Sequence, residues 1–121
     1  MKTKQIFLAG AFALASTAAM TAQAHAKLES SEPKAGSTLG SAPKVVRLRF
    51  NETLEAAFSN VKLSDAANGQ VALPKVELDK ADGKTMIATL PPLHPGEYHV
   101  QWSAMTHDGH KAKGEFTFSV K

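Results

Sequence analysis

Apolar and polar residues alternate in several short stretches of this 121-residue chain, and the clearest stretch is 97–104. There the apolar residues Tyr98, Val100, Trp102 and Ala104 occupy every second position. A period of two residues is typical of a β-strand with one buried face. Weaker versions of this pattern predict further strands at 27–31, 46–50, 61–63, 70–73, 76–78, 86–90 and 116–120.

Turn-forming residues separate these stretches. Asn68-Gly69 and Asp82-Gly83 are typical of tight turns, and the proline-rich segment 91–96 cannot continue a central strand. A helical turn is expected only within 52–59. About seven or eight short strands in one small chain predict an all-β fold, a small antiparallel Greek-key β-barrel or sandwich.

The first 24 residues have the pattern of a secretory signal. After a short basic start comes an apolar run at 6–15, and then Ala22-Gln23-Ala24, which fits the A-x-A pattern before a cleavage site. The apolar run is too short to span a bilayer. We therefore expect residues 1–24 to be removed on export and residues 25–121 to form a single domain.

Composition narrows the possible functions. Loss of Lys2 and Lys4 with the signal lowers the formal net charge from +3 to +1, and no cluster of basic and aromatic residues indicates nucleic-acid binding. The chain has no cysteine, so disulfides and thiolate ligands for zinc or Cu(I) are excluded. We expect a soluble protein of the bacterial periplasm, without membrane insertion.

Cleavage after Ala24 makes His25 the first residue of the exported protein. A free N-terminal histidine can chelate one metal ion through its α-amine and its own Nδ1. Cleavage after Ala26 also fits the A-x-A pattern and would remove this chelator. We favour the cut after Ala24, because the later cut places Lys27 beside the scissile bond.

A second group of possible ligands, Asp108-Gly109-His110, lies near the C-terminus. If the chain is extended there, Asp108 and His110 point to one face with their Cα atoms about 6.6 Å apart, and His107 points away. With His25, this set offers three nitrogens and one carboxylate oxygen. A sulfur-free N/O set is the kind that tetragonal Cu(II) prefers, and Cu(II) binds such sites most tightly among the divalent first-row metals.

Four segments of the chain resemble the CopC/PcoC family of periplasmic copper-resistance proteins. They are His25–Ser37, Leu48–Glu52, Pro95–Trp102 and Asp108–Val120. The resemblance implies a cupredoxin-like or immunoglobulin-like β-barrel that binds one Cu(II) per chain. It also implies a role with a CopD-type inner-membrane protein in copper tolerance or import.

The resemblance also assigns roles to residues. His25, Asp108 and His110 match the family's Cu(II) ligands, and Glu52 matches a glutamate beside that site that acts as a ligand or a hydrogen-bond partner. Members that also bind Cu(I) have a methionine-rich loop in mid-chain. The corresponding segment here, 63–70, contains no methionine or histidine, so we expect no Cu(I) site.

Two other hypotheses compete with the hypothesis of a copper carrier or buffer. A copper site with an N-terminal histidine also resembles the histidine brace of polysaccharide monooxygenases, which makes an oxidising enzyme the main alternative. Oxygen consumption by the ascorbate-reduced protein separates the two. A third reading is a structural or adhesive β-sandwich without metal, in which Asp108-Gly109 is only a turn. We expect His94, His99 and His107 to be surface or loop residues. We expect Met86 and Met105 to pack in the interior.

Overall fold

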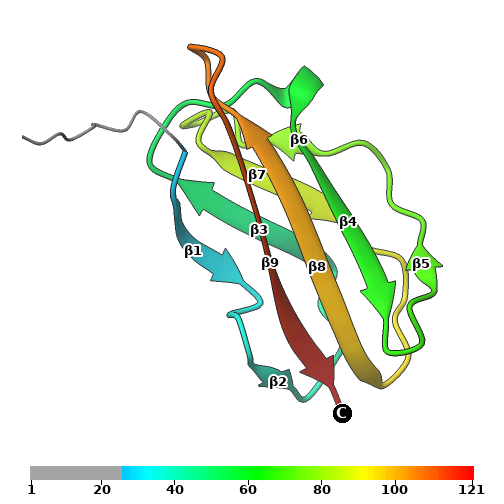
Figure 1. The fold of residues 1–121 in the computed structure, drawn as a ribbon. Helices are drawn as coiled ribbons and strands as arrows, with labels where there is room; N and C mark the ends of the chain where they lie inside the picture. The colour runs from blue at the N-terminus through cyan, green and yellow to red at the C-terminus, as the bar shows by residue number, and fades with distance from the viewer. Residues whose placement is uncertain (1–25) are drawn as a thin grey trace, which may run out of the picture.

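A computed structural model describes residues 26–121, which form two β-sheets packed face to face (Figure 1). The predicted signal and His25 lie outside the described residues. The strands are β1 (Leu28–Glu32), β2 (Thr38–Leu39), β3 (Val45–Phe50), β4 (Asn60–Asp65), β5 (Gln70–Val71), β6 (Glu77–Leu78), β7 (Thr85–Thr89), β8 (Gly96–Met105) and β9 (Lys111–Val120). One 3-10 turn, η1 (Ala56–Phe58), lies within the segment where a helical turn was predicted.

The order of the strands is that of a Greek-key sandwich. The first sheet runs β1-β3-β7-β6 and the second runs β2-β9-β8-β4-β5. The connections from β3 to β4, β5 to β6 and β7 to β8 cross between the sheets, which is the strand arrangement of immunoglobulin domains. The Tyr98 hydroxyl donates a hydrogen bond of 2.7 Å to the carbonyl of His94, as in the tyrosine corner of such domains. The all-β Greek-key prediction is therefore confirmed.

The predicted alternation places the core. Val46, Leu48 and Phe50 of β3 are fully buried, while Arg47 and Arg49 point outward. Burying one such aliphatic or aromatic side chain contributes about 1.5–3 kcal/mol. Among the other predicted interior residues, Met86, Trp102 and Phe118 are buried, and Met105 and Phe116 are half-buried.

Strand β2 was not predicted. It is two residues long and pairs in parallel with the end of β9, Thr38 with Ser119 and Leu39 with Val120. The other strand pairs are antiparallel, as expected.

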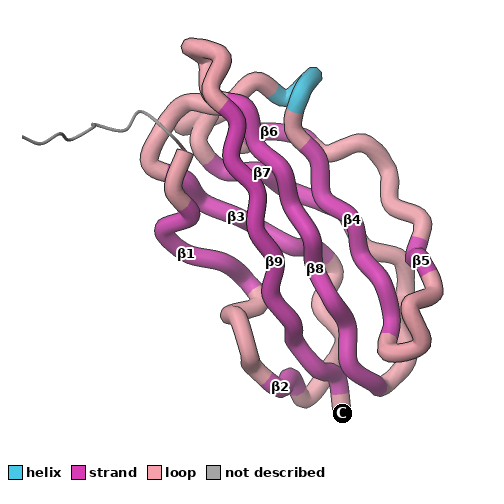
Figure 2. The backbone as a smooth tube through the Cα atoms, in the orientation of Figure 1, coloured by secondary structure: helices cyan, strands magenta, loops and turns pink. Residues whose placement is uncertain are grey.

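Three loops meet at one end of the sandwich (Figure 2). They are the segment 51–59 after β3, the loop 79–84 between β6 and β7, and the turn 106–110 between β8 and β9. Backbone hydrogen bonds join them, from Leu54 N–H to the Gly83 carbonyl at 3.0 Å and from His107 N–H to the Thr53 carbonyl at 3.0 Å. In residues 26–121 no helix is long and apolar enough to span a membrane.

Candidate metal centre

Asp108 and His110 lie on a tight turn between the two longest strands. Thr106 N–H donates to the His110 carbonyl at 2.8 Å, and Gly109 N–H donates to the Thr106 carbonyl at 2.9 Å. Gly109 has a φ of +94°, a conformation that glycine adopts without steric cost. The extended chain assumed in the strand-spacing argument is therefore wrong, because Asp-Gly here forms the turn that this dipeptide usually forms.

The turn nevertheless brings the two predicted ligands together. The Nδ1 atom of His110 lies 3.0 Å from Oδ1 of Asp108, and both side chains are about half exposed. An imidazole nitrogen and a carboxylate oxygen thus meet at the protein surface.

Thr106 fixes both residues from beneath. Its side chain is fully buried, its hydroxyl donates to Oδ1 of Asp108, and its Oγ1 accepts the His110 backbone N–H at 3.1 Å. The Thr106 hydrogen bond, followed by that of the His110 side chain, lowers the pKa of Asp108 to about 2. Asp108 is therefore an ionised carboxylate at neutral pH, the form that binds a metal cation.

A shallow pocket of about 310 Å³ adjoins the turn and is lined by Glu52, Thr53, His107 and Asp108. Glu52 makes no hydrogen bond or ion pair with another residue of 26–121. The His107 ring bonds to Oε2 of Glu55 at 2.5 Å. The His107 side chain thus contacts Glu55, and the expectation that it points away from Asp108 and His110 stays a prediction.

The start of the described chain lies beside Asn51, the residue before Glu52. Lys27 N–H donates to Oδ1 of Asn51 at 2.8 Å, and Asn51 N–H donates to the Lys27 carbonyl at 3.1 Å. Ala26 is buried, with 6% of its surface exposed. Since Asn51 directly precedes Glu52, residues 26 and 27 are fixed next to the segment that carries Glu52.

Of the four predicted site residues, the structure thus brings Asp108 and His110 together and places Glu52 with Asp108 along one pocket. His25 lies outside the described residues. Within 26–121 no group of three or more His, Asp or Glu residues is arranged to bind a metal ion. The four-residue site remains a prediction.

The family model of the CopC domain matches residues 28–121 of the chain. The chain belongs to the CopC domain family. Copper resistance protein C of Pseudomonas syringae pv. tomato is 39% identical over 116 residues, which cover 91% of each chain. The crystal structure of PcoC, a methionine-rich copper resistance protein from Escherichia coli, has a TM-score of 0.73 and 38% identity, and the match covers 81% of this chain and 100% of PcoC.

A longer relative contains a similar domain. Copper transport protein CutJ of Bacillus subtilis (strain 168) is 34% identical over 101 residues, which cover 83% of this CopC-family chain but 19% of CutJ. The family resemblance seen in the sequence is therefore confirmed, and the relatives are named for copper resistance and copper transport.

Several residues of the centre escaped the sequence analysis. Thr106 was passed over, although a threonine two residues before an aspartate in a turn is a common source of local side-chain hydrogen bonds. Asn51 bonds to Lys27, 24 positions earlier in the chain, and Glu55 bonds to His107, 52 positions later. No local pattern therefore indicates either residue. His94 is exposed, and His99 is half-buried and pairs with Glu115, consistent with the surface and loop positions expected for them.

Proposed function

We propose that this CopC-family protein binds one Cu(II) ion through the α-amine and Nδ1 of His25 together with Asp108 and His110. We further propose that it acts in the periplasm as a copper carrier or buffer that exchanges copper with a CopD-type inner-membrane protein. The observation that carries the proposal is the Asp108–His110 pair, with atoms 3.0 Å apart at the end of the sandwich where the described chain begins.

The chemistry of the available donors supports copper. Imidazole nitrogen and an ionised carboxylate suit Cu(II), and the absence of cysteine removes the ligand that would favour Cu(I) or zinc. Asp108 needs no deprotonation at neutral pH, so metal binding does not compete with a proton there. Its contact with Nδ1 of His110 also orients the imidazole ring, a common role of carboxylates beside metal-bound histidines.

The position of Lys27 supports His25 as the further ligand. Its two backbone hydrogen bonds fix it beside Asn51, and the next residue, Glu52, lines the pocket that Asp108 also lines. His25 precedes Lys27 by two residues, and consecutive Cα atoms are about 3.8 Å apart. This short link from Lys27 to His25 supports the proposal that the His25 α-amine joins Asp108 in one copper site.

The middle of the chain supports a single copper site. Residues 65–69 form a tight turn in which Asp65 Oδ1 accepts the N–H groups of Ala67 at 3.0 Å and Gly69 at 2.8 Å. This turn contains no sulfur or imidazole ligand, in contrast to the methionine-rich character that gives PcoC its description. We therefore propose that no second site binds Cu(I) with comparable strength.

The partner proposal rests on the longer relative. In CutJ a domain similar to this chain makes up about a fifth of a copper transport protein. By analogy, we propose that this separate chain exchanges its copper with a transport protein of the CopD type.

Native mass spectrometry of the exported protein tests the proposal. The protein is measured without metal and after one and two equivalents of Cu(II) or Zn(II). We expect a mass that begins at His25 and a single copper adduct that Zn(II) does not displace. A mass that begins at Lys27, or a second copper ion bound as tightly as the first, would contradict the proposal.

A further inference from the structure

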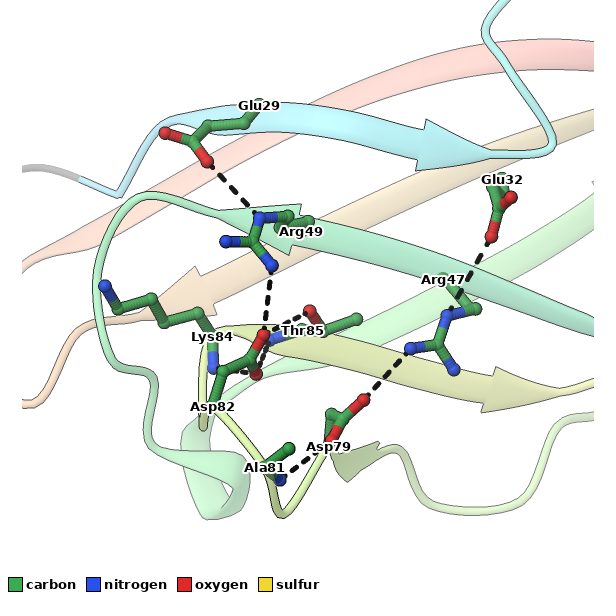
Figure 3. A network of polar contacts seen from close by, with 9 residues as sticks. All are labelled: Glu29, Glu32, Arg47, Arg49, Asp79, Ala81, Asp82, Lys84 and Thr85. Carbon is green, nitrogen blue, oxygen red and sulfur yellow. Dashed lines mark hydrogen bonds and ion pairs between the residues drawn. The ribbon is translucent and has the colours of Figure 1, made fainter.

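Two arginines on the outer face of the first sheet each connect two acidic residues from different elements (Figure 3). Arg49 of β3 lies with Nε 3.6 Å from Oε1 of Glu29 on β1, and with its Nη1 atom 3.2 Å from Oδ2 of Asp82. The Arg49 guanidinium therefore joins the first residues of β1 to the loop between β6 and β7.

Asp82 is itself fixed by its own loop. Its Oδ1 accepts the backbone N–H of Lys84 at 2.8 Å and that of Thr85 at 3.2 Å, and its Oδ2 accepts the Thr85 hydroxyl at 3.2 Å. The backbone hydrogen bond from Lys84 is the main reason that the pKa of Asp82 is lowered. Arg49 thus binds an ionised carboxylate whose position the loop determines.

The same loop contacts the segment that leads to the candidate metal centre. The Gly83 carbonyl accepts the Leu54 N–H at 3.0 Å, and the neighbouring Thr53 carbonyl accepts the His107 N–H at 3.0 Å. His107 directly precedes Asp108. A continuous series of hydrogen bonds and ion pairs therefore runs from Glu29 through the loop 79–84 to the turn that carries Asp108 and His110.

Strand β1 needs this support because it is an edge strand. Among the described strands only β3 pairs with it, and the register shifts between Leu28 and Ser30, so Glu29 lies at an irregularity in the ladder. At such an irregularity the ladder hydrogen bonds are locally interrupted, so Glu29 depends more on its side-chain contacts. The Glu29–Arg49 ion pair lies at that point.

We propose that Glu29, Arg49 and Asp82 are positioning residues that fix the start of β1, and with it the N-terminus, relative to Asp108 and His110. The inference rests on the proposed function, because it assigns these residues the task of setting the distance between two halves of one copper site. None of the three residues is a proposed copper ligand.

The second arginine provides a matched control. Arg47 lies two residues before Arg49 on the same face of β3 and pairs with Asp79 of the same β6–β7 connection at 3.0 Å. On β1, however, it approaches Glu32, at 3.9 Å, which is the last residue of the strand and has a side chain 78% exposed. Loss of Arg47 therefore removes a similar ion pair without releasing the N-terminal end of β1.

The test compares Arg49→Met with Arg47→Met in the exported protein. The first measurement, made without copper, is amide hydrogen exchange at 26–29. We expect faster exchange there in Arg49→Met and little change in Arg47→Met, although the two variants lose similar amounts of thermal stability. Equal exchange at 26–29 in both variants would overturn the proposal.

The second measurement is Cu(II) affinity by competition with a chelator, at low ionic strength and in 0.5 M sodium nitrate. Exposed ion pairs are weak and are screened by salt, so we expect Arg49→Met to lose about 3- to 10-fold in affinity at low ionic strength, and less in high salt. Arg49→Lys should recover only part of this loss, because a single lysine ammonium replaces the guanidinium that contacts both Glu29 and Asp82. Equal affinities for the wild type and Arg49→Met would overturn the positioning role. Failure of the wild type to bind copper would instead overturn the proposed function. In that case amide exchange at 26–29 decides whether these residues fix the start of β1.

Discussion

The indole ring of Trp102 lies directly against the backbone of Gly114, its partner on the neighbouring strand. A Cβ atom on Gly114 would lie 2.6 Å from Cζ2 of Trp102, which is closer than two non-bonded carbon atoms can approach. The same indole packs edge-on against Phe50, with ring centroids 5.0 Å apart. Since Phe50 directly precedes Asn51, this packing lies beneath the segment that carries Glu52.

We expect Gly114→Ala to destabilise the fold by about 1–3 kcal/mol, the usual cost of overpacking an interior. Urea unfolding followed by the fluorescence of Trp102, the single tryptophan of the chain, measures the change. Gly40→Ala is the control, because a Cβ there meets nothing within 4 Å. Equal unfolding midpoints for the two variants would show that the indole moves aside without cost.

Removal of either predicted ligand on the β8–β9 turn should weaken Cu(II) binding severely. Asp108→Ala removes the carboxylate that lies 3.0 Å from the imidazole, and His110→Ala removes the imidazole itself. His94→Ala and His99→Ala are controls, because His94 is exposed on another loop and His99 pairs with Glu115 on β9. Chelator competition measures all four affinities, and equal losses from the four variants would exclude this assignment of ligands.

Glu52→Gln should reduce Cu(II) affinity less than Asp108→Asn does. Glu52 shares the pocket with Asp108, and a residue that acts through hydrogen bonds beside a metal typically contributes about 10- to 100-fold in affinity. The two variants are compared in the same competition titration. A larger loss from Glu52→Gln would identify Glu52 as a direct ligand.

Thr106→Val should change the acid behaviour of the metal-free protein. The folded state lowers the pKa of Asp108 from 3.8 to about 2, so its ionisation stabilises the fold above pH 3.8, and this contribution is lost as the pH falls toward 2. The Thr106 hydroxyl is the largest cause of the shift. Its removal should raise the pKa of Asp108 toward 3.8, lower the stability above pH 3.8 and make the stability depend less on pH between 3.8 and 2.

Carboxyl-carbon NMR titration of Asp108 measures this pKa, and acid unfolding monitors the stability. Thr89→Val, at an exposed position of β7, is the control for loss of a hydroxyl. An unchanged Asp108 pKa in Thr106→Val would show that another group is responsible for the shift.

The alternation of residues on β3 and β8 predicted these two strands and their buried faces. A two-residue period has one structural meaning when it continues for six to ten residues, as in these strands. Strand β2 has two residues and depends on the distant end of β9, so no period could indicate it. The alternation of apolar and polar residues predicts a strand only when the strand is long enough for the alternation to repeat.

The structure corrects the expected geometry of the candidate centre, whereas its residues stay a prediction. Asp108 and His110 were predicted as ligands from residue type and family resemblance, yet the segment that carries them is a turn and not the extended chain that was expected. The support of the centre depends on pairs that are far apart in sequence: Lys27 with Asn51, Glu55 with His107, and Arg49 with Asp82. Such pairs are formed by strand pairing and loop contacts between distant segments, and a single sequence does not record them.

Cu(II) affinity of the protein with and without one additional glycine before His25 tests the central claim most directly. The addition converts the His25 α-amine, whose ordinary pKa is about 7.7–8.0, into a peptide amide that binds copper poorly unless it is deprotonated. It leaves the packing of the described core unchanged, so the thermal unfolding midpoint should stay the same. We predict that the extended protein loses Cu(II) affinity by orders of magnitude and that its type-2 electron paramagnetic resonance spectrum changes; equal affinity of the two forms would contradict the assignment of His25 as a copper ligand and the function built on it.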